Sequence, residues 1–100
     1  RGNKKLYIRL LGMFADSDEF QKLEDAIASG DNSAAASSVH TIKGMSGNLA
    51  LNAVFDLTSQ LMIQYRTDCV EPAMLEQYRQ ALKNTLCQIQ LLIFRLTAQV

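Results

Sequence analysis

The chain contains a single histidine, His40, which lies among small residues and is followed three positions later by Lys43. An imidazole titrates near neutral pH, and its neutral nitrogen is a nucleophile. On a helix, Lys43 would lie one turn beyond His40, where it could stabilise negative charge placed on the ring, such as a phosphoryl group. The pair therefore indicates phosphoryl chemistry at His40, and a solvated surface histidine without a role is the alternative.

Other chemistries find little support. No serine or cysteine nucleophile with a second acid pairs with the histidine, so a hydrolytic triad is not indicated. The segment 44–47 resembles a phosphate-binding loop only superficially, because the lysine that must follow is missing. Cys69 and Cys87 are too few and too far apart for a metal cluster. We expect no metal site and reduced thiols, with a disulfide as the alternative.

The histidine falls on the outer face of a predicted helix. If residues 32–51 are helical, one face carries a core stripe within roughly 80°, and His40 lies about 140° from its centre. The core stripe consists of Ala35, Val39, Ile42, Ser46 and Leu49. Apart from Lys43, the residues one or two turns from His40 on this face are all small. They are Ser33, Ala36, Ser37, Gly44 and Gly47.

Two glycines within this predicted helix need an explanation. Each costs about 1 kcal/mol relative to alanine, and on the solvent face core packing does not explain them. Without side chains at Gly44 and Gly47, a partner surface can approach the ring directly. The alternative is that the helix ends near Gly44. It is disfavoured because Ile42, Ser46 and Leu49 continue the core stripe past that point.

Helical apolar spacing extends over nearly the whole chain. The predicted inner faces are Leu6, Tyr7, Leu10, Leu11 and Phe14 in the first helix; Phe20, Leu23 and Ile27 in the second; Val54, Leu57, Thr58, Leu61 and Tyr65 in the fourth; and Leu75, Tyr78, Leu82, Leu86, Ile89, Ile93 and Leu96 in the last. Short connections between these segments predict an all-α protein, an antiparallel four-helix bundle with a short additional N-terminal helix. We expect residues 1–100 to form a single domain.

Boundary residues predict where the helices begin and end. Asp16, with Glu19 three positions later, is a candidate cap for the second helix, and Gly30 is placed to end it. The third helix is expected to be capped by Asp31 or Asn32, and the fourth by Asn52. Pro72 fits the first turn of the last helix.

Composition narrows the classes of function. Ten Lys and Arg balance ten Asp and Glu, which removes the electrostatic case for a nucleic-acid binder. No run of eighteen apolar residues is present, so we expect no membrane insertion of this domain. Residues 1–15 carry only positive charge, whereas residues 16–31 hold six acids against Lys22. We expect these charges to meet across antiparallel helices; a docking surface for a charged partner is the alternative.

The segment 39–49, Val-His-Thr-Ile-Lys-Gly-Met-Ser-Gly-Asn-Leu, resembles the signature of the histidine-containing phosphotransfer (HPt) domain, and the helix layout agrees over nearly all 100 residues. That signature runs roughly Ala-His-x-Leu-Lys-Gly-x-x-x-x-Leu-Gly. Val39 and Ile42 replace the usual Ala and Leu, and Ala50 stands where the family often has Gly. These differences concern the contour of the docking surface and not the chemistry.

The resemblance implies a bundle whose exposed histidine accepts a phosphoryl group from a receiver-domain aspartate and passes it to another receiver. Carried over by position, His40 is the phosphorylated residue and Lys43 supports the phosphoryl group. The receiver then docks over Ala36, Ser37, Gly44 and Gly47. Such a bundle is not an enzyme by itself. The response-regulator receiver supplies the aspartate and Mg²⁺, ATP is used by the parent kinase, and this domain needs no cofactor.

The resemblance also places the domain in a larger protein. It implies a monomeric, cytoplasmic module at the C-terminus of a bacterial hybrid sensor histidine kinase that is anchored in the inner membrane. Two alternatives remain. The dimerisation and phosphoacceptor domain of a histidine kinase commonly has an acid after the histidine, where this chain has Thr41. A helical interaction module without phosphotransfer is disfavoured by His40 and Lys43 together.

Overall fold

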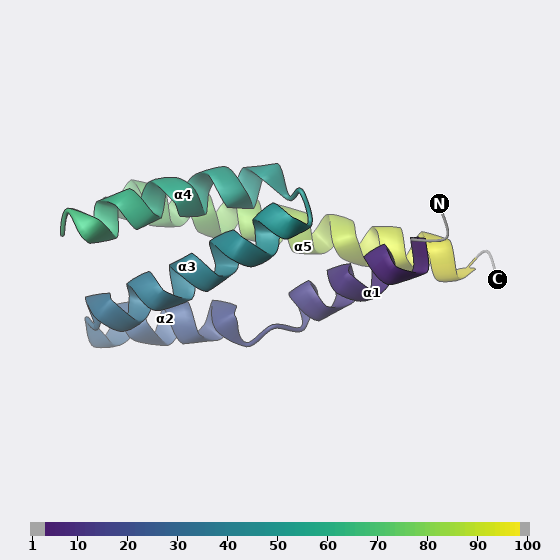
Figure 1. Cartoon of the computed structure of the whole chain (residues 1–100), viewed down its shortest axis with the longest axis horizontal. Helices are drawn as coiled ribbons and strands as arrows, with labels where there is room; N and C mark the ends of the chain where they lie inside the picture. The colour runs from purple at the N-terminus through teal and green to yellow at the C-terminus, as the bar shows by residue number, and fades with distance from the viewer. Residues whose placement is uncertain (1–3, 99–100) are drawn as a thin grey trace.

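The computed structural model describes residues 4–98, with side chains up to residue 96, as five helices and no strand within that range. The helices are α1 (Lys4–Ala15), α2 (Glu19–Ser29), α3 (Asn32–Asn48), α4 (Asn52–Arg66) and α5 (Pro72–Ala98). Helices α2 to α5 form an antiparallel bundle, and α1 packs on the far half of the long α5 (Figure 1). This confirms the predicted all-α bundle with an additional N-terminal helix. None of the described helices is long and apolar enough to cross a membrane.

Three of the predicted boundaries are confirmed. Gly30 ends α2 in the left-handed conformation, with φ of 73°, which glycine adopts without steric cost. The Asp31 side chain caps α3 by accepting a hydrogen bond from the backbone N–H of Ala34 at 3.0 Å. Pro72 is the first residue of α5, where its missing N–H would have no helical partner.

The predicted cap of α2 is wrong. Asp16 still belongs to the last turn of α1, because its N–H donates to the carbonyl of Gly12 at 3.0 Å. Asp18 takes the cap position without a side-chain hydrogen bond. The hydroxyl of Ser17 accepts instead from the N–H of Glu19 at 3.2 Å.

The end of α3 also differs from the prediction. The helix stops at Asn48 and not at Leu51, because Ala50 adopts a left-handed φ of 56°. The N–H of Leu51 donates to the carbonyl of Ser46 at 2.9 Å, and that of Ala50 to the carbonyl of Gly47 at 3.2 Å. This is a Schellman-type ending, in which glycine is the usual residue at the position of Ala50. Leu51 therefore precedes α4, and Asn52 is its first helical residue and not its cap.

Two apolar clusters hold the helices together. The first lies between the four helices α2, α3, α4 and α5. It consists of Leu23, Ala26, Ala35, Val39, Ile42, Val54, Leu61 and Tyr78. The second joins α1, the end of α3 and α5 through Leu11, Phe14, Leu49 and Ile89. The whole predicted core stripe of α3 is buried, which confirms its orientation. The chain therefore has a bundle core and a smaller core that attaches α1.

The predicted inner face of α1 is only partly confirmed. Leu11 and Phe14 are buried, whereas Leu6, Tyr7 and Leu10 are 52%, 42% and 39% exposed. Within the described chain, α1 packs mainly on α5 and contacts the end of α3, so part of its apolar surface has no neighbour. The Tyr7 hydroxyl nevertheless donates to the carbonyl of Leu49 at 3.1 Å and ties α1 to the end of α3.

The expected meeting of the basic and acidic segments is not found. Because α1 packs on α5, no ion pair joins α1 to α2 within residues 4–96. Among residues 4–96, one ion pair links two helices: the guanidinium of Arg79 in α5 lies 2.9 Å from the carboxylate of Glu24 in α2. The other ion pairs there lie within α5 or within α2 and its cap residue Asp18. The cations of α1 thus remain without a carboxylate partner in this part of the chain.

Tyr78 is the one described residue with a buried side-chain polar atom that has no hydrogen-bond partner. It is fully buried in α5, and burial raises the pKa of Tyr78 above that of a free tyrosine, with the nearby Glu24 carboxylate adding to the shift and Arg79 opposing it. The hydroxyl therefore stays protonated in the folded state at a pH where an unfolded tyrosine ionises.

We expect Tyr78→Phe to raise the free energy of unfolding at pH 7 by about 1 kcal/mol, since a buried polar group without a partner carries a cost of that order. Above pH 10 the unfolded tyrosine loses its proton while folded Tyr78 keeps it, so wild-type stability falls by about 1.4 kcal/mol per pH unit from this residue. The Tyr78→Phe variant has no ionisable group at this position, so its stability should not fall in this way above pH 10. Urea unfolding between pH 7 and 11 measures both effects, and parallel curves for the two proteins would contradict the assignment.

Candidate functional site

His40 lies in the middle of α3 on the face opposite the core. Its side chain is exposed, whereas Val39 and Ile42 on the other side of the helix are fully buried. One turn before the histidine lie Ala36 and Ser37, and one turn after it lie Lys43 and Gly44; these four are half-buried or exposed. The structure thus brings these five predicted site residues together on one open face of α3, and Gly47, two turns after the histidine, is exposed on the same side.

Helix geometry alone orients the ring. Within the described part of the chain, the His40 side chain makes no hydrogen bond and no ion pair. The adjacent hydroxyl of Thr41 is turned to the backbone, where it donates to the carbonyl of Ser37 at 3.2 Å. Both imidazole nitrogens are therefore free to meet a partner, and no neighbouring acid or hydroxyl acts on them as a base.

Lys43 lies one turn along α3 from the histidine, and its side chain is half-buried. It forms no ion pair with a carboxylate among residues 4–96. Helix α3 carries no Asp or Glu between its first and last residues. Lys43 is therefore a cation of α3 that is available to an anionic group placed at the histidine.

The two glycines have different surroundings. A Cβ at Gly44 would meet nothing within 4 Å, which agrees with the open approach predicted there. A Cβ at Gly47 would lie 2.9 Å from Cε1 of Phe55, a half-buried residue on α4. The prediction that core packing does not explain these glycines is therefore wrong for Gly47. Its missing side chain makes room for an aromatic ring of the neighbouring helix.

Phe55 is a residue that sequence reasoning missed. It lies to one side of the α4 stripe that contains Val54 and Thr58, so helical periodicity alone did not assign it to an interface. A large aromatic residue at the edge of one predicted stripe, with a glycine in the preceding helix, is the signal that could have revealed the contact. Phe55 therefore forms part of the surface next to the histidine face.

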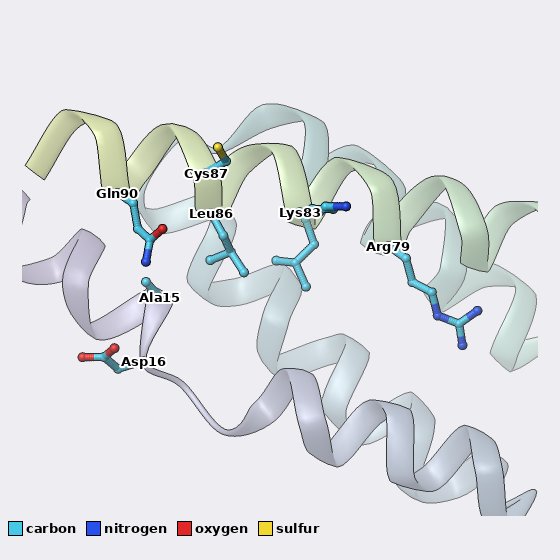
Figure 2. Close-up of a pocket in the computed structure, with 8 residues that line it drawn as sticks. Ala15, Asp16, Arg79, Lys83, Leu86, Cys87 and Gln90 are labelled. Carbon is cyan, nitrogen blue, oxygen red and sulfur yellow. The ribbon is translucent and has the colours of Figure 1, made fainter. Parts of the chain in front are cut away.

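Polar side chains also line two grooves outside this face. One groove lies between α2 and α3, where Glu19, Lys22, Asp25 and Asp31 face Ser37 and Thr41. The other groove, of about 490 Å³, lies between α5 and the connection from α1 to α2, and Figure 2 shows Leu86 and Gln90 pointing from α5 toward Ala15. Arg79 at its end is already bonded to Glu24, and no residue of α3 lines the groove. Cys69 and Cys87 are exposed and free, and the described residues contain no His, Cys, Asp and Glu group that could hold a metal ion.

The different surroundings of the glycines predict different effects of alanine. Gly44→Ala should raise the free energy of unfolding by about 1 kcal/mol, the propensity difference in an exposed helix. Gly47→Ala should give no such gain, because the new methyl group meets the ring of Phe55. In a Phe55→Ala background the same change should recover the gain, which a double-mutant cycle of unfolding free energies measures. Equal gains from both glycines in the wild-type background would contradict the packing.

Comparison with known proteins agrees with the geometry. Neither a search of curated proteins nor a search of solved structures gave a match. A family model, the Hpt domain, matches residues 9–91, a range that contains all of α2, α3 and α4 and the whole histidine face. This match confirms the resemblance seen in the signature around His40. The chain belongs to the Hpt domain family, whose members are phosphotransfer modules of two-component signalling that interact with receiver domains and are not enzymes in themselves.

Proposed function

We propose that His40 accepts a phosphoryl group from the aspartyl phosphate of a receiver domain and passes it to a response regulator. The observation that carries the proposal is the exposed ring in the middle of α3, which has no hydrogen-bond partner among the described residues. A nucleophile in this position can enter the active site of another protein without first breaking contacts of its own.

The transfer requires little chemistry from this chain. The unprotonated nitrogen of the neutral imidazole attacks the phosphorus atom, a P–N bond forms, and the P–O bond to the receiver aspartate breaks. The aspartate leaves as a carboxylate, and the proton on the second ring nitrogen is free to pass to water. Transfer to the next receiver reverses these steps. We expect the receiver to supply the aspartate and Mg²⁺, and the parent kinase to use ATP.

Lys43 is the residue of this chain best placed to stabilise the phosphoryl group. It lies on the adjacent turn, and no described carboxylate competes for its ammonium group. A charge-assisted contact with a phosphoryl oxygen would favour phosphohistidine over the free ring. Ala36, Ser37 and Gly44 present little side-chain volume around His40, so a receiver can reach the ring over them.

The setting of the domain in the cell is part of the same proposal. A chain of this family with a free histidine face fits a relay module of a bacterial hybrid sensor histidine kinase. There it would act on the cytoplasmic side of the membrane as a monomer, without binding nucleic acid.

The first test changes the nucleophile. His40→Gln should keep the melting temperature of the wild type, because the ring is exposed and makes no contact that the fold needs. It should accept no label from a phosphorylated receiver, whereas the wild type acquires acid-labile phosphate. Incubation with radiolabelled receiver phosphate, tried for each receiver of the source organism, followed by gel electrophoresis provides the measurement.

Two neighbouring hydroxyl variants serve as controls, since Ser37→Ala and Thr41→Val remove the other acceptors near the ring and should label normally. ATP alone should label none of these proteins. Persistent labelling of His40→Gln, or loss of label in both controls, would reject His40 as the acceptor. Absence of label on the wild type with every receiver would favour the alternative of an interaction module without phosphotransfer.

The second test changes the cation. Lys43→Ala should slow transfer from the receiver or shorten the life of phosphohistidine by about tenfold, the effect of losing one charge-assisted contact worth about 1.4 kcal/mol. The melting temperature should change little. Lys43→Arg keeps the charge and should therefore restore most of the wild-type transfer rate and phosphohistidine lifetime. Lys83→Ala on α5 is the matched surface control. Wild-type rates and lifetime for Lys43→Ala would show that this lysine is a solvated charge without a role.

A further inference from the structure

Helices α1 and α5 extend together beyond the other three helices and form one end of the molecule. The start of α1 lies beside the last turns of α5 there (Figure 1). Tyr7 of α1 lines a common space with Gln88, Ile89 and Leu92 of α5, so these two segments, far apart in the sequence, are neighbours. Residues 4–9 and 88–96 make up this distal end.

The distal end exposes large apolar side chains. Leu91 and Phe94 of α5 are 49% and 70% exposed, and Leu6 of α1 is 52% exposed. Leu91 and Phe94 are three positions apart and therefore share one face of α5. Among the large apolar residues of α2, α3 and α4, by contrast, the described chain exposes only Ile63. A cluster of exposed apolar side chains on a small protein indicates a contact with something outside the chain.

The charges of the distal end are all positive. Lys4, Lys5 and Arg9 of α1 and Arg95 of α5 are exposed, and residues 4–9 and 88–96 contain no Asp or Glu. None of these cations forms an ion pair within residues 4–96. Cations beside exposed apolar side chains are typical of a surface that lies on anionic phospholipid. The apolar groups enter the headgroup region, and the cations meet the phosphates.

Charge and shape both favour lipid over a protein as the occupant. A second copy of this chain would bring the same cations, so self-association through the distal end meets like-charge repulsion. Helix α1 packs on the side of α5 that carries Ile89, and Leu91, two positions later, faces away from α1. Leu6 is exposed on α1 itself, so the distal end is apolar on more than one side. A folded partner would cover one of these sides, whereas lipid headgroups can surround a projecting tip.

We propose that the distal end binds peripherally to an anionic phospholipid surface. The apolar side chains enter the headgroup region while the four cations contact lipid phosphates. This contact needs no helix that crosses the bilayer, and none of the described helices could do so. His40 lies on α3, beside α2 and α4 in the other part of the molecule, so its face stays open to a receiver (Figure 1). The proposal does not depend on phosphotransfer at His40.

The first test removes charge. Sedimentation measures binding to sucrose-loaded vesicles of phosphatidylglycerol and phosphatidylcholine in equal parts, with vesicles of phosphatidylcholine alone for comparison. The wild type should bind the anionic vesicles, and added salt should release it because salt screens the charges. Lys5→Gln combined with Arg9→Gln should lower the partition coefficient by about 25-fold, since each cation near an anionic surface contributes about fivefold. Arg66→Gln combined with Lys83→Gln removes two exposed cations outside the distal end and should bind like the wild type.

The second test reports on insertion. The chain contains no tryptophan, so Leu91→Trp places a single fluorescent reporter at the distal end. Ile63→Trp is the matched control, because Ile63 is 61% exposed on α4. Anionic vesicles should shift the emission of Leu91→Trp to shorter wavelength, because the indole leaves water, and should leave that of Ile63→Trp unchanged. The melting temperatures of all the variants should match that of the wild type, since every substituted side chain is exposed.

The outcomes decide between occupants. Binding to anionic vesicles that only the Lys5 and Arg9 changes weaken, with an emission shift of Leu91→Trp alone, supports the proposal. No binding, equal binding to both kinds of vesicle, or equal loss in the two double variants overturns it. A shift of Leu91→Trp without vesicles that grows with protein concentration would identify a second copy as the occupant and also overturns it. Labelling of His40 enters none of these measurements, so the proposed function stands or falls separately.

Discussion

The burial of one face of α3 is the constraint on which the rest of the molecule depends. Val39 and Ile42 are fully enclosed between α2 and α4, and a helix that buries one stripe must turn the opposite stripe outward. His40 lies on that outward stripe. Its position therefore follows from apolar packing on the far side of the same helix, and the ring keeps both nitrogens free because no hydrogen bond is needed to hold it.

The close contact between α3 and α4 depends on small residues whose polar groups are satisfied locally. The buried hydroxyl of Ser46 donates to the carbonyl of Ile42 at 2.9 Å, and that of Thr58 to the carbonyl of Val54 at 2.7 Å. Each hydroxyl is thus paired within its own helix and can lie in an apolar interface without loss. Phe55 then packs over Gly47. One glycine of the signature serves this packing, while Gly44, one turn nearer the histidine, leaves the approach to the ring open.

Helix α1 extends the bundle and packs against the end of the helix that carries the histidine. Its own core with Leu49 and Ile89 attaches it to the end of α3 and to α5, and the hydrogen bond from Tyr7 to Leu49 strengthens that attachment. Because only one side of α1 is covered, its remaining apolar side chains lie beside the same helix that carries the histidine. Helix α1 therefore holds the end of α3, and one side of α1 stays open next to it.

The sequence by itself determined the local features: the helical segments, the αL ending at Gly30, the cap at Asp31, the start at Pro72 and the outward position of His40. Each depends on residues within a turn or two of one another, so periodicity and capping preferences were sufficient. Only the tertiary structure decided that Phe55 occupies the space at Gly47 and that Leu10 and Met13 line a groove with Met45 of α3. These features depend on which helices lie side by side, and residues far apart in the chain become neighbours only when the helices pack.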